Sequence, residues 1–356
     1  MFKEELSRVA DRIDTVIRTE AFPDRIEPEF LRSAVRDYPQ RGGKRLRPAI
    51  LLWSCGLCGG NPEQAINAAA AVEIFHNWTL VHDDIIDDDD FRRGRPTTHA
   101  ALRTLAGDKY GLTGESAAKF GRDFAILAGD LQQAWANRML LRSVENGVAP
   151  ELAVKLALRM QDFVNRELIS GEALDVEFPF IGPEKLTAEQ VNRMLYLKTG
   201  VLLRFCAETG AMIAMNTTDL ARPELVALGE FAANAGIAFQ YRDDWLGLYG
   251  DQAKFGKPIG SDLAEAKPTL LLINALAALP PTDRDELLGL LGRETYPEAV
   301  LERARTLIRN SGAEAWLLHE AEQRLAAART RLSTLPDNSY RQLLAELLDY
   351  LAGRTV

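Results

Sequence analysis

Apolar residues recur at every third or fourth position along most of the chain, which is the spacing of amphipathic helices. Segments that alternate β-branched and polar residues are almost absent, so the pattern predicts an all-α fold. In the first half, helices are expected over 3–18, 28–38, 49–58, 62–87, 118–145 and 150–178, with another beginning near 96. In the second half, they are expected over 187–210, 270–279, 283–291, 296–310, 313–333 and 338–352, with another beginning at 223. Residues 105–117, rich in glycine and polar side chains, are expected to form a loop.

The expected helix over 62–87 ends in a dense acidic run, Asp83-Asp84-Ile-Ile-Asp87-Asp-Asp-Asp90, which we expect to remain helical until about Arg93-Gly94. Six carboxylates within eight residues repel one another. A hard divalent cation such as Mg²⁺, shared with substrate phosphates, would neutralise them. A solvated acidic loop is the alternative, but the run continues an apolar helix.

His76 lies on the same helical stripe as Leu80, Asp83 and Asp87, because a helix turns by about 100° per residue. A histidine in an apolar helix is often a core residue with satisfied hydrogen bonds. Its place on the acidic stripe makes a ligand contact an equal alternative.

A second polar stripe, Gln240, Asp243, Asp244 and Gly247, ends the helix that begins at 223, and a basic loop follows it. The chain thus repeats one pattern, a helix that ends in two aspartates and is followed by a basic loop. Two facing carboxylate clusters could hold several metal ions and one polyphosphate.

Basic residues gather in Arg41-Gly-Gly-Lys44-Arg45-Leu-Arg47-Pro48. Clustered cations beside glycines suit an oxyanion such as diphosphate, although a basic surface turn is the alternative. Lys198 stands in an apolar segment, where it needs an anion or extends to solvent.

Composition limits the possible partners and compartment. The net charge of −9 over 356 residues argues against a nucleic-acid partner. No 18-residue apolar run is present, so no transmembrane segment is expected. Three cysteines, an odd and small number, fit a reducing cytoplasm. Cys55 and Cys58 are expected to pack in the core.

The order of these motifs resembles that of the trans-isoprenyl diphosphate synthases, also called polyprenyl synthetases. From Gly42 to Lys267 the chain carries Gly-Gly-Lys-Arg-Leu-Arg-Pro, His-Asp-Asp-x-x-Asp with Arg-Arg-Gly-x-Pro-Thr, Ala-Ile-Leu-Ala-Gly-Asp, Lys-Thr-Gly, Phe-Gln-x-x-Asp-Asp and Gly-Lys-Pro-x-Gly-Ser-Asp. One Asp-rich motif would be weak support, whereas six motifs in the family's order are specific.

The resemblance implies one domain over residues 1–356, a bundle of about a dozen helices around a central cavity. It also implies a homodimer that joins isopentenyl diphosphate to an allylic diphosphate (dimethylallyl, geranyl or farnesyl), with three Mg²⁺ ions when substrate is bound. Non-catalytic regulatory subunits, terpene cyclases and head-to-head condensing enzymes are the alternatives.

Matched to the family's motifs, the residues divide by role. The resemblance implies metal ligands at Asp83, Asp84, Asp87, Asp243 and Asp244. It implies contacts to the allylic diphosphate from Arg92, Lys198 and Lys257, with Lys267 nearby. It implies a metal-free site for isopentenyl diphosphate at Lys44, Arg47, His76 and Arg93. Thr199 and Gln240 would present oxygens to the allylic carbon. The chain departs from the family at Gly247, where many members have a third aspartate, and at Glu172, where many have glutamine.

Product length depends on the residues upstream of Asp83. Trp78 and Phe75 are expected to close the cavity, roughly 7.5 and 12 Å along the helix from that aspartate. An aromatic residue at 78 followed by the small Thr79 resembles the geranylgeranyl (C20) type. The helical wheel agrees only in part, because Trp78 projects about 140° away from Asp83. We expect a C20 product, with farnesyl diphosphate (C15) as the alternative.

Overall fold

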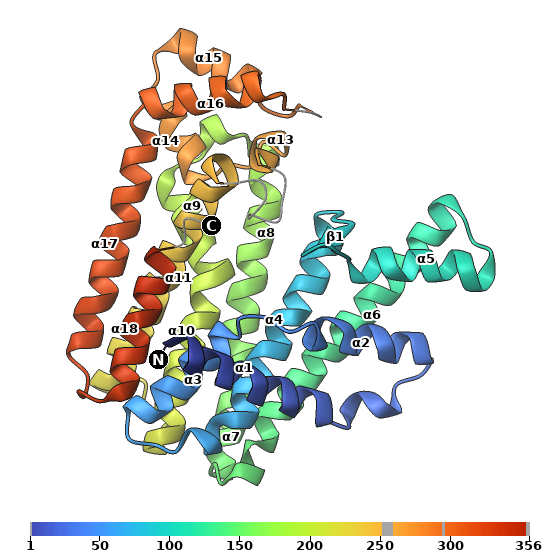
Figure 1. The fold of residues 1–356 in the computed structure, drawn as a ribbon, viewed down its shortest axis with the longest axis vertical. Helices are drawn as coiled ribbons and strands as arrows, with labels where there is room; N and C mark the ends of the chain where they lie inside the picture. The colour runs from blue at the N-terminus through green and yellow to red at the C-terminus, as the bar shows by residue number, and fades with distance from the viewer. Residues whose placement is uncertain (1, 251–258, 294–295, 354–356) are drawn as a thin grey trace. The chain divides into compact units, whose positions relative to one another are not determined.

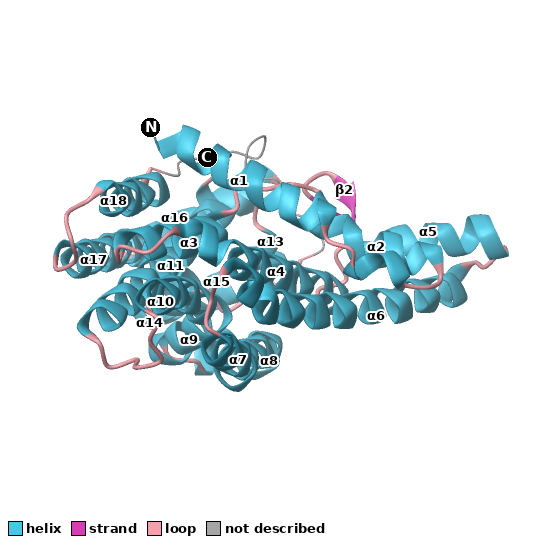
Figure 2. Ribbon diagram, turned by 90° about the horizontal axis from the view of Figure 1, so that it is seen from below, coloured by secondary structure: helices cyan, strands magenta, loops and turns pink. Residues whose placement is uncertain are grey.

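The computed structural model describes residues 2–250, 259–293 and 296–353, which are helical almost throughout, so the all-α prediction is confirmed (Figures 1 and 2). The chain forms two compact units. The first unit comprises Met1–Met160 and Cys206–Leu220, and the second comprises Gln161–Phe205 and Ala221–Val356.

The first unit is built from long helices joined by short turns. It contains α1 (Phe2–Thr19), α2 (Glu29–Gln40), α3 (Leu46–Leu57), α4 (Ile66–Ile86), α5 (Thr98–Tyr110), α6 (Gly114–Leu141), α7 (Pro150–Arg159) and the end of α10 (Val201–Met215). Three 3₁₀ turns lie over Phe22–Arg25, Pro62–Ala65 and Arg142–Asn146. The apolar period therefore located most of these helices, with boundary shifts of a few residues.

Helix α4 packs along α6, and α6 also packs along α5 (Figure 1). Two glycines of α6 allow these close approaches. A Cβ atom at Gly129 would lie 2.2 Å from Nε2 of His82, and one at Gly121 would lie 2.3 Å from the carbonyl oxygen of His99. Glycine lowers the helix propensity of α6 at these positions, but it leaves room for the His82 ring of α4 and the His99 carbonyl group of α5.

The loop expected over 105–117 is wrong. α5 continues to Tyr110 and α6 begins at Gly114, so only three residues connect the two helices. Gly111 ends α5 with φ +66°, a conformation that favours glycine. The glycines mark the ends of two helices rather than the inside of a loop.

The expected continuation of the acidic helix to Arg93-Gly94 is also wrong. α4 ends at Ile86, and a two-residue hairpin follows, β1 (Phe91–Arg92) paired with β2 (Arg95–Pro96). Arg93 and Gly94 form its turn with φ +53° and +73°. Positive φ at both central residues is the mark of a type I′ turn. The hairpin separates Arg92, in a strand, from Arg93, in the turn.

The second unit contains the remaining helices. These are α8 (Arg166–Ile181), α9 (Ala188–Leu195), the start of α10, α11 (Pro223–Tyr249), α13 (Ser261–Ala264), α14 (Leu270–Ala278), α15 (Pro281–Gly289), α16 (Glu298–Asn310), α17 (Ala313–Ser333) and α18 (Ser339–Ala352). Two π-helical turns, Met160–Asn165 and Tyr196–Gly200, interrupt the segments that the sequence predicts as continuous helices.

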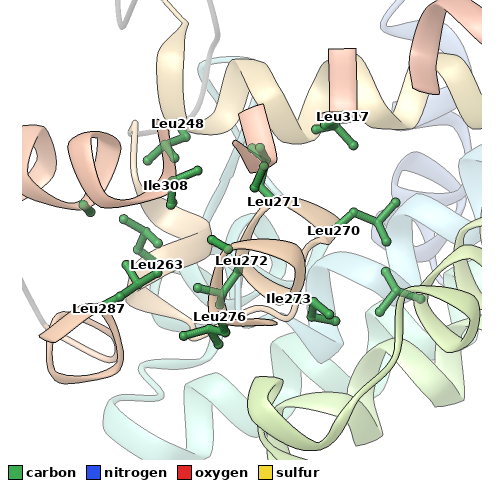
Figure 3. Close-up of a cluster of buried hydrophobic side chains, with 14 of the residues drawn as sticks. Leu248, Leu263, Leu270, Leu271, Leu272, Ile273, Leu276, Leu287, Ile308 and Leu317 are labelled. Atoms are coloured by element: carbon green, nitrogen blue, oxygen red, sulfur yellow. The ribbon is translucent and has the colours of Figure 1, made fainter. Parts of the chain in front are cut away.

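Helix α14 forms the centre of the second unit's core (Figure 3). Leu270, Leu271, Leu272 and Leu276 are all buried, which accounts for a helix that is apolar on every side. Thr269 caps this helix, since its Oγ1 accepts a hydrogen bond from the Leu272 amide at 3.3 Å. The capping residue of α14 lies two positions after Lys267, one of the predicted site residues.

Among the described residues, no helix is long and apolar enough to cross a membrane. None of the three cysteines, all of which lie in the described residues, forms a disulfide bond. Cys55 and Cys206 are buried, and burial raises the pKa of Cys55 to about 12. This agrees with the expectation that Cys55 packs in the core, whereas Cys58, expected there too, is only half-buried.

Candidate active site

The end of α4 holds a buried carboxylate network. Asp84 is only 1% exposed, and its Oδ1 accepts a 2.6 Å hydrogen bond from Nε of Arg92. Nη2 of Arg92 also lies 3.3 Å from Oδ2 of Asp83. The Tyr38 hydroxyl, on α2, donates to Oδ2 of Asp84. The network therefore joins helix α4 to helix α2 and to the hairpin, while Asp87, which directly follows α4, is exposed.

Carboxylates satisfy two of the four cations in the basic segment. Arg41 pairs with Asp37 at 2.5 Å. Arg45 is buried and donates to Glu73 at 2.6 Å and to Asp14 at 2.8 Å. Arg45 lies at the N-terminal end of α3 with φ +48°, an uncommon conformation for a side chain of this size. The ion pairs of these two arginines therefore stabilise the backbone conformation of the basic segment.

Arg47 belongs to a different group, in which positive charges gather around His76. Nε of Arg47 is buried and has no hydrogen-bond partner among the described residues. Burial, opposed by Glu73 and reinforced by Arg93, lowers the pKa of Arg47. Burial and the guanidinium groups of Arg47 and Arg93 hold the pKa of His76 well below its usual range. His76 is therefore neutral at physiological pH and can act as a hydrogen-bonding group rather than as a cation.

Gly43 makes room for Arg93 in this basic cluster. A Cβ atom at Gly43 would lie 3.4 Å from Nη1 of Arg93, and Gly43 has φ +152°. Lys44 is exposed beside it. Three of the four residues assigned to isopentenyl diphosphate, Arg47, His76 and Arg93, thus lie close enough together for the two guanidinium groups to lower the pKa of His76.

In the second unit, the π-helical turn Tyr196–Gly200 carries Lys198 and Thr199. Such turns inside helices are frequent at functional sites. A Cβ atom at Gly171 of α8 would lie 2.5 Å from the Lys198 amide nitrogen, so α8 approaches the turn closely. Nζ of Lys198 lies 2.8 Å from Glu172 and 2.7 Å from Asp175.

Asp175 joins two of the predicted lysines. Its Oδ2 also lies 3.2 Å from Nζ of Lys267. Burial alone would raise the pKa of Asp175, but Lys267 and Lys198 outweigh burial and lower it. Lys198, which stands in an apolar segment, is therefore paired with the carboxylates of Glu172 and Asp175, one of the two alternatives that the sequence left open.

Thr199, Gln240 and Asp244 form a hydrogen-bonded chain. The Thr199 hydroxyl donates to Oε1 of Gln240 at 3.5 Å, and Nε2 of Gln240 donates to Asp244 at 3.2 Å. Burial and the nearby Asp262 raise the pKa of Asp244 to about 8. Gly247 accepts a 2.9 Å hydrogen bond from the Gly260 amide, which holds the segment carrying Asp262 against α11.

A small cavity lies at this point in the second unit. Gly247, Asp244, Asp262 and Thr269 line it together with leucines of the α14 core. Asp262, which also lines this cavity, is close enough to raise the pKa of Asp244.

The donor set suits Mg²⁺, which prefers carboxylate oxygens and usually retains phosphate or water ligands. Asp244 fits this role, because a cation beside a buried carboxyl of raised pKa stabilises its ionised form. Among the described residues, no three His, Cys, Asp or Glu side chains converge closely enough to enclose a metal ion by themselves. Lys257 lies outside the described residues.

The predicted chain-length residues lie in the helix core. Phe75 is fully buried, Trp78 is 7% exposed, and their rings meet edge to face with centroids 4.9 Å apart. Trp78 also contacts His82, at a ring distance of 5.7 Å, on the face that meets Gly129 of α6. Thr79 donates a 2.8 Å hydrogen bond to the His76 carbonyl oxygen.

The sequence analysis did not single out Tyr38 and Glu73, and it gave no separate role to Asp262, the last residue of the Gly-Lys-Pro-x-Gly-Ser-Asp motif. The charge of Glu172 is expected to raise pKa values near Asp175, but Lys267 and Lys198 lower the pKa of Asp175 instead. Tyr38 and Glu73 lie far along the chain from their partners, and no local spacing reveals them.

Comparison with known proteins identifies the family. Residues 28–308 match the polyprenyl synthetase family. A short chain isoprenyl diphosphate synthase of Methanothermobacter thermautotrophicus is 32% identical, over 98% of this chain and 97% of that protein. A geranylfarnesyl diphosphate synthase of Aeropyrum pernix is 36% identical, over 92% of this chain and 96% of that protein. The crystal structure of geranylgeranyl pyrophosphate synthetase from Pyrococcus horikoshii covers 99% of both chains at 32% identity, with a TM-score of 0.85. The chain belongs to the polyprenyl synthetase family, and among these enzymes it is a short-chain prenyl diphosphate synthase.

Proposed function

We propose that this enzyme joins isopentenyl diphosphate to an allylic diphosphate and releases geranylgeranyl diphosphate (C20) and diphosphate. One observation in the first unit carries the proposal. The carboxylates Asp83 and Asp84 are linked through Arg92 to a cluster of guanidinium groups around the neutral His76. One helix, α4, thus supplies both a carboxylate end suited to a metal-bound diphosphate and a residue of a metal-free anion site.

We assign the allylic diphosphate to the carboxylate end. Asp83 and Asp87 of the first unit and Asp243 and Asp244 of the second would hold three Mg²⁺ ions, which would supply charge neutralisation to the departing diphosphate. Asp84 matches the same motif, but it is buried and each of its oxygens accepts a hydrogen bond, so it would orient Arg92 rather than bind a metal ion. The cations that would bind its oxygens directly are Arg92, Lys198, Lys257 and Lys267. Lys198 must exchange part of its contact with Glu172 for the ligand, and Asp175 keeps it in place meanwhile.

We assign isopentenyl diphosphate to Arg47, Arg93 and Lys44, with the neutral His76 donating or accepting a hydrogen bond. Guanidinium groups bind phosphate oxygens with two parallel hydrogen bonds. This diphosphate must survive the reaction, so a site that binds it without a metal ion avoids activating its C–O bond.

The reaction then needs no side-chain nucleophile. The allylic C–O bond breaks, and its electron pair leaves with the diphosphate. The double bond of isopentenyl diphosphate attacks the resulting carbocation, forming the new C–C bond. A proton is then lost to the released diphosphate. The oxygens of Thr199 and Gln240, which share a hydrogen bond, would stabilise the carbocation by their dipoles.

We propose that Trp78 and Phe75 limit the product to C20, supported by their burial and mutual ring contact. We also propose a homodimer in the cytoplasm. The exposed Ile126 and Leu127 on α6 support the homodimer. The three cysteines, which form no disulfide bond, support the cytoplasm.

The test is a product-sizing assay. Purified protein is incubated with MgCl₂, labelled isopentenyl diphosphate and each of dimethylallyl, geranyl and farnesyl diphosphate, and the products are dephosphorylated and sized. C20 from all three primers is expected. C15 as the end product would favour the farnesyl alternative. No incorporation by the protein alone would refute the proposal and favour the regulatory subunit that the replacement at Gly247 suggests.

A further inference from the structure

Tyr38 lies outside the motifs that carry the proposed reaction, yet it reaches the carboxylate end of α4. It stands near the C-terminus of α2 and is only 3% exposed. Its hydroxyl donates to Oδ2 of Asp84. A tyrosine that served only to fill the core would not need this buried charge as a partner, and phenylalanine would fill the same space.

Tyr38 and Arg92 together use both oxygens of the Asp84 carboxylate. Oδ2 accepts from Tyr38, and Oδ1 accepts from Arg92 at 2.6 Å. Since Asp84 is 1% exposed, both bonds are shielded from water. A carboxylate held between two donors has a fixed orientation, and it fixes its partners in turn.

The same contacts determine which part of Arg92 remains available. Its Nε and Nη2 atoms make the bonds to Asp84 and Asp83. Among the described residues, Nη1 of Arg92 makes no hydrogen bond. An Arg92 anchored through two nitrogens can offer the third to a phosphate oxygen without losing side-chain freedom on binding.

Arg41 ties α2 to the hairpin at a second point. Its guanidinium lies 4.3 Å from the centroid of the Tyr38 ring, and its Nη2 donates to the Pro96 carbonyl oxygen at 2.7 Å. The end of α2 is thus bound to both strands of the hairpin, to Arg92 through Asp84 and to Pro96 directly. Tyr38 takes part in both connections, through its hydroxyl bond to Asp84 and through the contact of its ring with Arg41.

We propose that Tyr38 is a positioning residue: its hydroxyl orients Asp84, and Asp84 holds Arg92 with Nη1 ready for a diphosphate oxygen. This inference rests on the proposed function, which places a diphosphate at Arg92. Removal of the hydroxyl leaves Oδ2 of Asp84 buried without its donor, so Asp84 turns both oxygens toward Arg92 and withdraws it from the ligand.

The experiment measures binding of inorganic diphosphate in the presence of MgCl₂ by isothermal titration calorimetry, together with the KM of each substrate. Tyr38→Phe removes only the hydroxyl. A hydrogen bond to a charged group is worth enough to change affinity by about 10- to 100-fold. We expect diphosphate binding to weaken by about that factor, and the KM of the allylic diphosphate to rise with it. The KM of isopentenyl diphosphate should change less than about 3-fold.

Tyr296→Phe is the matched control. It also removes a tyrosine hydroxyl from a hydrogen bond, 2.6 Å to the Leu290 carbonyl oxygen, but in the second unit and at a residue that has no proposed role in the reaction. It should leave both KM values unchanged. In an Asp84→Asn background, Tyr38→Phe should change diphosphate binding less than about 3-fold, because Tyr38 acts through the Asp84 charge.

Two results would overturn the inference: unchanged diphosphate binding in Tyr38→Phe, or equal effects of this substitution with Asp84 and with Asn at position 84. If Tyr38→Phe is unfolded at the assay temperature, the comparison is made at a lower temperature where circular dichroism shows native helix content. The binding measurement needs no turnover. Failure of the wild type to incorporate isopentenyl diphosphate would therefore contradict the proposed function without deciding the role of Tyr38.

Discussion

Glu73 should be among the most important charged residues for the stability of the first unit. It lies on α4, is 6% exposed, and accepts a 2.6 Å hydrogen bond from Nη1 of Arg45. The Arg45 side chain is 1% exposed. Burial works against the charged form of Arg45, but Glu73 and Asp14 outweigh it and raise the pKa of Arg45. Removing Glu73 therefore leaves a buried guanidinium with too little negative charge around it, close to Arg47.

Glu73→Ala should lower the free energy of unfolding by about 3–5 kcal/mol, the usual cost of breaking a buried ion pair from one side. Glu73→Gln keeps the side-chain volume and an acceptor for Arg45, so it should recover roughly 1 kcal/mol of that loss. Glu63→Ala is the control. It removes the partner of Arg12 in an exposed pair, and such pairs contribute less than about 1 kcal/mol.

Urea denaturation followed by circular dichroism measures these differences. Addition of isopentenyl diphosphate should raise the unfolding midpoint of Glu73→Gln more than that of the wild type, because the bound anion replaces the missing charge. A loss below about 1 kcal/mol in Glu73→Ala, comparable with Glu63→Ala, would refute the reasoning, since Arg45 would then not depend on this carboxylate.

Three other outcomes follow from the site. Burial and Asp262 raise the pKa of Asp244 to about 8, so this carboxyl is mostly protonated at pH 7 in the metal-free protein. Because its pKa is higher in the folded than in the unfolded chain, the free energy of unfolding should fall as the pH rises from about 4 to 8. Mg²⁺ binding should release a proton and tighten up to about tenfold per pH unit below that pKa, as calorimetry in buffers of different ionisation enthalpy can show; absence of proton release would contradict this. Arg47→Ala should raise the KM of isopentenyl diphosphate by about tenfold or more with a smaller change in kcat, whereas Lys198→Ala should mainly lower kcat; equal effects of both would contradict the two-site assignment. Trp78→Ala should lengthen the product beyond C20, and an unchanged product would move the limiting role to Phe75 or to another helix.

Local patterns in the sequence predicted the helices well, since the apolar period is a property of each segment alone. α4 and α11 were found with boundary shifts of a few residues, and the paired aspartates lie at the C-terminal ends of both helices. The failures have local causes as well. Glycine at 111 and 114 indicated a loop, but these residues end one helix and begin the next.

The same local patterns could not predict which side chains pair when they lie far apart along the chain. Tyr38 and Asp84 are 46 positions apart, and Arg45 and Glu73 are 28 apart. Which carboxylate a given arginine reaches depends on how helices pack, and no spacing within one segment encodes it. A turn at Arg93-Gly94 was recognisable in principle, because glycine readily adopts the positive φ that the second position of a type I′ turn requires.

The basic segment shows why charge density alone does not identify a binding residue. Four cations stand within seven residues, but Arg41 and Arg45 are satisfied by carboxylates and hold the backbone. Arg47 senses both the carboxylate of Glu73 and the like charge of Arg93, and burial still lowers its pKa. Its buried Nε has no partner among the described residues, so an incoming anion gains more there than at Arg41 or Arg45. Lys198 is the opposite case, since a ligand must compete with Glu172 and Asp175. A cation with few counter-charges favours tight binding of an anion. A cation that exchanges partners can release its ligand, which suits the role that we propose for Lys198 at the leaving diphosphate.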